Sequence, residues 1–441
     1  MDATTPSFRA PGRALRLGAA TVLAAMTVTL GACSSSTTTS SPAASGGDDR
    51  GPITLATGKD TTGTLQKQLD AWNSAHPAEK VTLIELPAAA DQQRQQLIQN
   101  AQTKSDAYTV VGLDVVWTAE FAARRWIDEI PPSRVPTSAM LASTVATGEY
   151  FGKQYAIPFQ TNAGVLFYRK DLLDAAGVPA PKTWDDMRTA CARIAKLPQG
   201  AGVDCYAGQL DKYEGLTVNF AEAVQSAGGT VIGADGKPTL DTPAARKGLQ
   251  TLVDAVRSGM IPKAETTYQE EDGRKRFQDG KLVFHRQWPY QWELANKTDG
   301  SSKVAGKFAV TTLPAIDGVG SSTLGGLNLA ISSFGKHKAS AADFIKFLTS
   351  EENERQSLAA ASTAPVYGEL YEDPALQAKF GYLKTLKASL DTAVPRPKMV
   401  DYGDATAAVQ DDVAAALSGA ETVDAALADL QTKLTALAEA K

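Results

Sequence analysis

Short apolar segments alternate with amphipathic segments through most of this 441-residue chain, and this alternation is what most constrains its fold. The apolar runs 53–57, 81–86 and 110–117 have the length of strands, and segments with helical spacing separate them; in the first of these segments Leu65, Leu69 and Trp72 are spaced by four and three residues. Such runs are typical of strands in a parallel sheet that helices cover on both faces. Open sheets of this kind bind ligands beyond the carboxyl ends of their strands. We therefore expect an α/β fold with a ligand site at such an edge.

A second pattern of strands and helices begins near 155–168. Further strands are expected at 281–285, 307–313 and 327–331, and helices after Thr183, over 243–258, around 341–348 and from Val423 to Leu437. The helix after Thr183 is expected to bury Met187, Ile194 and Leu197. The leucine stripe of the last helix is compatible with a coiled coil, but packing on its own lobe is the favoured interpretation.

Composition argues against several classes of function. The 44 basic and 49 acidic residues give a net charge of −5 without a basic run, which disfavours nucleic acid as a partner. The three His and three Cys have no zinc-ligand spacing, so we expect no metal and no cofactor. A P-loop, a G-x-S-x-G elbow and a G-x-G-x-x-G turn after a strand are missing from the sequence, which favours binding over catalysis. Composition does not exclude a glycosidase carboxylate pair.

The first residues predict export. Three arginines precede the uncharged stretch 17–30, which is too short for a mature membrane span, and LGAC at 30–33 resembles the lipobox of bacterial lipoproteins. We expect residues 1–32 to be a lipoprotein signal peptide and Cys33 to be lipidated; a plain signal peptide with a chance cysteine is the alternative. Residues 33–50 then form the lipid anchor and a flexible, Ser/Thr-rich tether on the outer face of the cytoplasmic membrane. In this oxidising setting Cys191 and Cys205 either form a disulfide or both stay free.

Nine short motifs occur along the chain that would remain after the signal peptide: WNSAHP at 72–77, DVVWTAEF at 114–121, IPFQTN at 157–162, TWDD at 183–186, GG at 228–229, F-x-x-G-K at 277–281, LP at 313–314, GGLNLA at 325–330 and VPRP at 394–397. In order and spacing they resemble the motifs of bacterial extracellular solute-binding proteins of sugar-uptake ABC transporters. Within this family the sequence is most similar to the trehalose-binding lipoproteins of actinobacteria, and the maltose-binding group is more distant.

The resemblance implies an α/β, two-lobed periplasmic-binding-protein fold, the Venus flytrap. In this fold the chain crosses three times between the lobes, at a hinge. The implied crossings lie near 159–163, 310–315 and 366–372, the N-terminal lobe comprises 51–160 and 314–367, and the C-terminal lobe comprises 161–313 and 368–441. A disaccharide would lie between the closing lobes, and membrane permease subunits, with a separate ATPase, would receive it. The chain would then be a monomer and no enzyme. A surface α-glucoside hydrolase and a peptide- or metal-binding protein on the same scaffold stay open as alternatives.

A disaccharide site calls for carboxylates and amides, an arginine fork and aromatic rings, because the sugar presents hydroxyl groups and apolar ring faces. By the resemblance or by their chemistry, ten residues are candidates: Asp60, Gln93, Asp114, Asn162, Glu214, Trp288, Tyr290, Gly325, Gly326 and Arg396.

Each candidate has a structural alternative. By the resemblance, Gln93 and Glu214 match ligand contacts of the trehalose group and Tyr290 matches a stacking ring of the maltose-binding relatives. Asp114 interrupts an apolar run, where an unpaired charge is costly, and Arg396 is held between two prolines. The structural alternatives are backbone N–H groups that satisfy Asp114, a solvated helix face for Gln93 and a surface position for Glu214. For the rings of Trp288 and Tyr290 the alternative is packing in the core, and for Arg396 it is a surface salt bridge.

The other candidates rest on position. Asn162 lies at the expected first crossing, where a turn residue is the alternative, and Trp288 follows a strand. Gly325 and Gly326 would let the backbone approach a sugar closely, or would simply form a turn. Asp60 follows the first strand and is the weakest choice.

Overall fold

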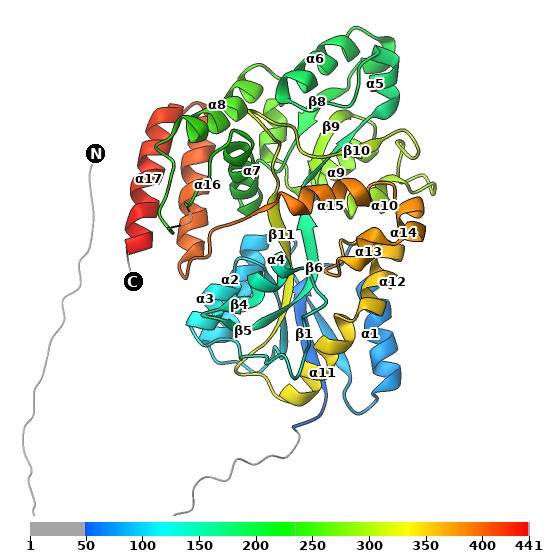
Figure 1. Cartoon of the computed structure of the whole chain (residues 1–441), viewed down its shortest axis with the longest axis vertical. Coiled ribbons are helices and arrows are strands. Elements are labelled where there is room, and N and C mark those ends of the chain that lie inside the picture. The colour runs from blue at the N-terminus through cyan, green and yellow to red at the C-terminus, as the bar shows by residue number, and fades with distance from the viewer. Residues whose placement is uncertain (1–48, 234, 440–441) are drawn as a thin grey trace, which may run out of the picture. The chain divides into compact units, whose positions relative to one another are not determined.

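Two mixed β-sheets, each covered by helices, form the two lobes of the chain (Figure 1). The structure is a computed structural model that describes residues 49–233 and 235–439. The predicted signal peptide, Cys33 and nearly all of the tether lie outside the described residues. None of the helices in the described part combines the length and the apolar character that a membrane span needs.

The first sheet has the strand order β12-β11-β3-β1-β2, and β6 also pairs with β11. Its strands are β1 (Ile53–Gly58), β2 (Val81–Leu86), β3 (Val110–Asp114), β6 (Ala156–Ala163), β11 (Thr323–Ile331) and β12 (Val394–Pro395). β1 runs parallel to β2 and β3, whereas β11 runs antiparallel to both β3 and β6. The carboxyl ends of β1 and β3 therefore lie at the same edge of this sheet.

The second sheet has the order β10-β7-β9-β8. Its strands are β7 (Val165–Tyr168), β8 (Asp204–Ala207), β9 (Leu282–Gln287) and β10 (Ala309–Thr311). Only β8 and β9 are parallel, and β7 is antiparallel to both β9 and β10. The expectation of parallel sheets was therefore only partly right. β6 leads from the first sheet into the second lobe and β11 leads back from it, so these two strands run antiparallel; a parallel pair would need a crossover segment that returns the chain to the same edge.

The apolar positions that the sequence indicated for the first helix form its buried face in the first lobe. Leu65, Leu69 and Trp72 on α1 (Thr64–Ala75) are buried in one cluster with Phe344 and Ile345 on α11 (Lys338–Leu348). The other helices of this lobe are α2 (Ala90–Gln102), α3 (Thr118–Ala123), α4 (Ala142–Val145) and α12 (Glu351–Ala361).

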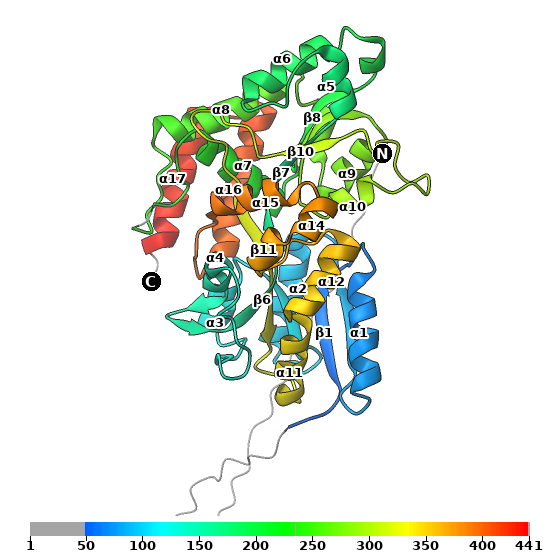
Figure 2. The same cartoon turned by 45° about the vertical axis from the view of Figure 1, so that its right-hand side comes forward.

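In the second lobe, α7 (Glu214–Ser226), α8 (Pro243–Arg257), α16 (Tyr402–Ser418) and α17 (Val423–Glu439) lie side by side (Figures 1 and 2). Leu427, Leu430 and Leu434 of α17 are buried in the core of this lobe, so the leucine stripe packs on its own lobe as expected. α5 (Lys170–Ala176), α6 (Trp184–Ile194), α9 (Glu270–Gln278) and α10 (Gln291–Ala295) belong to the same lobe. The short helices α13 (Glu369–Glu372), α14 (Pro374–Lys379) and α15 (Leu383–Asp391) follow α12, and α15 contacts both β6 and β7.

Several boundaries differ from the sequence prediction, and three of the differences affect the argument. The strand expected over 110–117 ends at Asp114, because the Asp114 carbonyl and carboxylate accept backbone N–H groups of Trp117 and Val116 in a turn. α6 ends at Ile194, so Leu197 follows the helix instead of lying in it. β12 pairs with β11 of the first sheet, although the sequence prediction assigned all of 368–441 to the other lobe.

The chain passes from the first sheet to the second at Gly164, since β6 pairs with β11 as far as Ala163 and β7 begins at Val165. It returns between β10 and β11, within 312–322. A third buried cluster contains residues of both sheets, such as Leu324 and Phe167, together with Leu386 of α15. The lobes are therefore joined by a packed hinge.

The disulfide lies in the second lobe. Cys191 of α6 and Cys205 of β8 are bonded, with 5.6 Å between their Cα atoms and 14 residues of sequence separation. The bond ties the end of α6 to the edge strand of the second sheet.

Candidate functional site

A cleft of about 560 Å³ lies where the carboxyl end of β1, the end of β6 and the first turn of α9 meet. Both lobes contribute to its walls. The polar or aromatic lining side chains include Lys59, Asp60, Thr61, Thr62, Gln68, Gln93, Phe159, Gln160, Asn162, Gln269, Glu270, Glu271, Asp272, Tyr290, Ser357 and Thr363. The site thus occupies the sheet edge expected for an open α/β fold.

Asp60 and Gln93 line the wall of the first lobe. The Asp60 carboxylate accepts the backbone N–H groups of Thr62 and Leu65, each at 2.8 Å, and the Thr62 hydroxyl at 2.6 Å. Asp60 therefore shapes the loop into α1 and keeps only part of its accepting capacity for a ligand. The Gln93 amide donates to the Ala88 carbonyl at 3.1 Å, which leaves its oxygen and one N–H for the cleft.

Asn162 and Gly326 line the floor of the cleft on paired strands of the first sheet. Gly326 has φ of 141°, and a Cβ atom on it would lie 2.4 Å from the Gln160 carbonyl oxygen. Only glycine fits this position, because the left-handed backbone and the close approach both exclude a side chain.

The wall of the second lobe is acidic and aromatic. Tyr290 donates its hydroxyl to Glu271 Oε1 at 2.7 Å, and Tyr213 donates to Glu270 Oε2 at 2.7 Å. Burial raises the pKa of Glu270, while hydrogen bonds from the side chains of Tyr213 and Trp288 act to lower it. Burial and the adjacent Glu271 carboxylate raise the pKa of Tyr290, so this phenol stays a donor at neutral pH.

Trp288 and Gly325 lie next to this cleft, and neither is part of its lining. The Trp288 ring covers the guanidinium of Arg286, with 3.9 Å between Cζ and the ring centroid. A Cβ on Gly325 would come within 3.0 Å of the same ring, so the absent side chain makes room for the indole. Trp288 is partly buried, and its ring packs on a guanidinium, so it is not an apolar core residue.

Asp114, Glu214 and Arg396 form a separate network that bridges the lobes. Arg396 donates from Nη2 to Asp114 Oδ1 at 2.6 Å and from Nη1 to Glu214 Oε1 at 2.5 Å. Glu214 also accepts the hydroxyls of Tyr402 and Thr406. Asp114 ends β3 of the first lobe and Glu214 begins α7 of the second. Arg396 thus joins a residue of each lobe, Asp114 and Glu214.

The network is buried except at Asp114. The side chains of Arg396 and Glu214 are 2% and 5% exposed, whereas that of Asp114 is 21% exposed. The alternatives of a surface Glu at 214 and a surface salt bridge at 396 are therefore wrong. Burial raises the pKa of Glu214; burial acts to lower the pKa of Arg396, but the two carboxylates hold it well above its usual value.

The sequence candidates fall into three places. Asp60, Gln93, Asn162, Tyr290 and Gly326 line the cleft. Trp288 and Gly325 pack together beside it, and the other three form the interlobe network.

Several lining residues were not singled out in the sequence. Phe159 and Gln160 precede Asn162 in the same strand. Residues two apart in a strand point to the same face, so the sequence could have indicated Gln160 from Asn162, but not Phe159. Glu270 and Glu271 follow Gln269, whose side chain and Asp272 form a capping box. That capping pattern marks a helix start, but no local signal shows that the first turn faces a cleft.

The arrangement can hold a neutral, hydroxyl-rich ligand. Amides and hydroxyls can exchange hydrogen bonds with it, and the rings of Phe159 and Tyr290 offer apolar faces. Within the described ranges, no group of three or more His, Cys, Asp or Glu side chains is arranged to hold a metal ion.

Known proteins that are similar over most of this chain are binding proteins of transporters or share their fold. A probable ABC transporter-binding protein of Deinococcus radiodurans is 32% identical over 363 residues, which cover 79% of this chain and 84% of that protein. The maltose-bound structure of T. maritima MalE3 superposes with a TM-score of 0.83 at 32% identity, over 88% of this chain and 99% of that one. The GacH receptor of Streptomyces glaucescens, solved unliganded and with acarbose, shares the fold with a TM-score of 0.79 at 24% identity, over 89% of this chain and 99% of that one.

The family profile described as bacterial extracellular solute-binding protein matches residues 58–355. This range runs from the last residue of β1 into α12, so it contains most strands of both sheets and most of the residues that line the cleft. The two-lobed fold expected from the sequence is confirmed by these matches. The chain belongs to the bacterial extracellular solute-binding proteins.

Proposed function

We propose that this chain is the substrate-binding subunit of an ABC importer and that it captures an α-glucoside disaccharide, trehalose in the first place and maltose-type sugars next. The observation that carries the proposal is the cleft of about 560 Å³, to which both lobes supply polar and aromatic side chains. A ligand that bridges such walls stabilises the closed arrangement, because contacts from each lobe are satisfied together only there. The maltose in the 32% identical MalE3 structure supports a disaccharide of this class.

The ten candidate residues divide the work of binding in this proposal. Asn162, Gln93 and Asp60 offer hydrogen bonds from the first lobe, Tyr290 offers a ring and a hydroxyl from the second, and Gly326 lets the backbone approach the sugar. Asp114, the exposed end of the interlobe network, accepts a sugar hydroxyl while Arg396 keeps it oriented. The remaining residues, Glu214, Trp288 and Gly325, hold these groups in place.

Anchoring and delivery complete the proposal. Cys33 carries the lipid that holds the chain at the outer face of the cytoplasmic membrane, and the closed form of the chain docks on the permease subunits. The chain acts as a monomer and carries out no chemical step itself.

Two experiments test this function. In a thermal-shift screen with trehalose, maltose, sucrose and a peptide mixture, an α-glucoside disaccharide should raise the melting temperature, because a ligand that binds only the folded chain stabilises it. Stabilisation by the peptide mixture alone would contradict the sugar assignment. Incubation with trehalose or maltose should release no glucose; turnover that is lost on replacement of one cleft carboxylate would identify a hydrolase instead.

A further inference from the structure

A buried ion pair lies beside the points where the chain passes between the lobes. Arg286 of β9 donates to Glu222 of α7 through two bonds, Nε to Oε2 at 2.8 Å and Nη2 to Oε1 at 2.5 Å. Its Nη1 donates to the Gln209 side-chain oxygen at 3.0 Å. The side chains of Arg286 and Glu222 are 1% and 7% exposed. Two charges so far from water persist only with such complete pairing.

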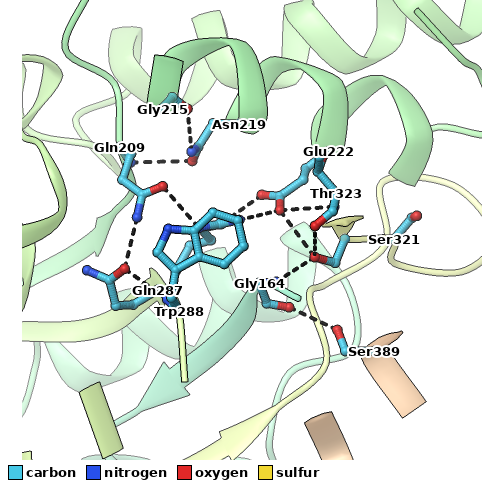
Figure 3. Close-up of polar contacts among 12 residues, drawn as sticks. Gly164, Gln209, Gly215, Asn219, Glu222, Gln287, Trp288, Ser321, Thr323 and Ser389 are labelled. Carbon is cyan, nitrogen blue, oxygen red and sulfur yellow. Dashed lines mark hydrogen bonds and ion pairs between the residues drawn. The ribbon is translucent and has the colours of Figure 1, made fainter. Parts of the chain in front are cut away.

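The same pair is bonded to both of the strand crossings (Figure 3). Glu222 Oε1 accepts the Thr323 backbone N–H at 3.2 Å, at the start of β11, and lies 3.4 Å from the Ser322 hydroxyl, whose single proton it shares with the Thr323 carbonyl at 3.0 Å. The Ser322 hydroxyl oxygen accepts the backbone N–H of Gly164, at the crossing from β6 to β7. The Gly164 carbonyl accepts the Ser389 hydroxyl of α15 at 2.9 Å. A single carboxylate therefore links two crossings.

The crossing at Gly164 lies directly against the ion pair. A Cβ atom on Gly164 would lie 2.5 Å from Arg286 Nη2 and 2.8 Å from Glu222 Oε1. Protein interiors are packed densely, so the Gly164 backbone has no room to shift unless the Arg286 guanidinium shifts as well. The backbone at the crossing and the guanidinium must therefore move together.

The other face of Arg286 leads to the cleft. The Trp288 ring covers the guanidinium at 3.9 Å, and the side chain of Trp288 lies close enough to the cleft residue Glu270 to act to lower its pKa. A second path runs from Gln209 Nε2 to Gln287 Oε1 at 2.9 Å and from Gln287 Nε2 to the Glu270 carbonyl at 2.8 Å. In Figure 3, Gln209 and Gln287 lie on one side of the Trp288 ring, and Glu222 and Thr323 lie on the other.

We propose that Arg286, held by Glu222, is the positioning residue of the hinge: it fixes the geometry of both crossings relative to the Trp288 ring and the Glu270 wall of the cleft. Loss of the pair lets the crossings move independently of the cleft wall, so the chain samples more interlobe arrangements and a smaller fraction of molecules is competent to bind. The apparent dissociation constant rises in inverse proportion to that fraction. The inference deepens the proposed function and rests on it for its binding readout.

The test compares matched variants at temperatures well below their melting points. R286M removes the charge, R286M/E222M removes both charges, and G164A leaves both charges but fills the space that the guanidinium occupies. The control is R169M, which breaks the bidentate pair of Arg169 with Asp171 in the same lobe, where Arg169 contacts the Gly280 carbonyl and not a crossing. The double variant keeps the test usable if R286M alone fails to fold, because it leaves no unpaired buried charge.

Two readouts separate hinge positioning from general stability. Pulsed electron-spin distance measurement between labels at the exposed positions Lys67 and Ala428 should give a narrow interlobe distribution for the wild type and R169M, and a broad one for the three hinge variants. Calorimetric titration with the sugar found by the thermal-shift screen should give a dissociation constant raised about tenfold in the hinge variants, as expected if about a tenth of the molecules remain competent, and unchanged in R169M.

Unchanged distance distributions in all three hinge variants would overturn the inference, as would an equal effect of R169M. If the wild type binds no sugar, the proposed function fails, but the distance distributions of the unliganded variants still decide the hinge inference.

Discussion

Glu265 is predicted to make the stability of the chain fall as the pH rises through the neutral range. It lies in the 3₁₀ turn Lys263–Thr267, is 1% exposed, and neither carboxylate oxygen has a hydrogen-bond partner among the described residues. Arg276 Nε is the cation facing it, at 4.0 Å, and Asp204 adds a like charge. Burial, together with Asp204, raises its pKa from the ordinary 4.5 to about 8.

The sign and the size follow from proton linkage. Between pH 4.5 and about 8 the folded chain holds a proton on Glu265 that the unfolded chain has lost, so folding takes up a proton and stability decreases with pH. At about 1.4 kcal/mol per pH unit, the full effect is about 5 kcal/mol, all of it present below pH 4.5 and lost by about pH 8.

Urea unfolding of the wild type and E265Q at pH 5 to 9 measures this effect. The glutamine stays neutral, so the free energy of unfolding of E265Q relative to the wild type should rise by about 4 kcal/mol between pH 5 and pH 9, since part of the full effect is already lost at pH 5. E129Q, which breaks an exposed pair with Lys153, is the control and should follow the wild-type curve closely. Parallel curves for the wild type and E265Q would refute the reasoning.

Three further predictions concern stability and binding. Replacing both Cys191 and Cys205 with serine should lower the free energy of unfolding by about 3 kcal/mol, since the bond closes a short loop of 14 residues, and reducing agent should then have no further effect on urea unfolding. G326A should cost at least about 1–3 kcal/mol and weaken sugar binding in calorimetry, because of its φ of 141° and the facing backbone carbonyl, whereas G381A, with open space around it, should leave both unchanged. R396M should destabilise by about 3–5 kcal/mol in thermal unfolding, because it leaves two carboxylates without their buried cation; a change below about 1 kcal/mol would contradict the network's role.

Local patterns determined much of the fold in advance. The spacing of Leu65, Leu69 and Trp72 predicted α1 and its buried face, and the alternating leucines of α17 predicted a helix that packs inward. The helix expected after Thr183 is α6, and Thr183 begins it with a capping box. These features depend on residues a few positions apart, so the sequence expresses them directly.

Strand direction and the contents of the site could not be obtained in this way. β11 joins the first sheet only because the chain returns from the other lobe, so its antiparallel pairing with β3 depends on long-range topology. Glu214 was chosen by its resemblance to a ligand contact and Arg396 by its setting between two prolines, but the two residues lie 182 positions apart in sequence and only the fold shows that they bond each other. For the same reason Glu270, on a turn that faces the cleft, carried no sequence signal.

Isothermal titration with trehalose and with maltose, on the wild type and on Y290A, tests the central claim most directly. Tyr290 lines the cleft, and its hydroxyl bonds Glu271, so Y290A removes one wall of the site while leaving both lobes' cores intact. The wild type should bind one of the two sugars with a dissociation constant near 1 μM, about −8 kcal/mol, and Y290A should bind it at least tenfold more weakly. No heat of binding from either sugar, or equal affinity in Y290A, would contradict a sugar site in this cleft.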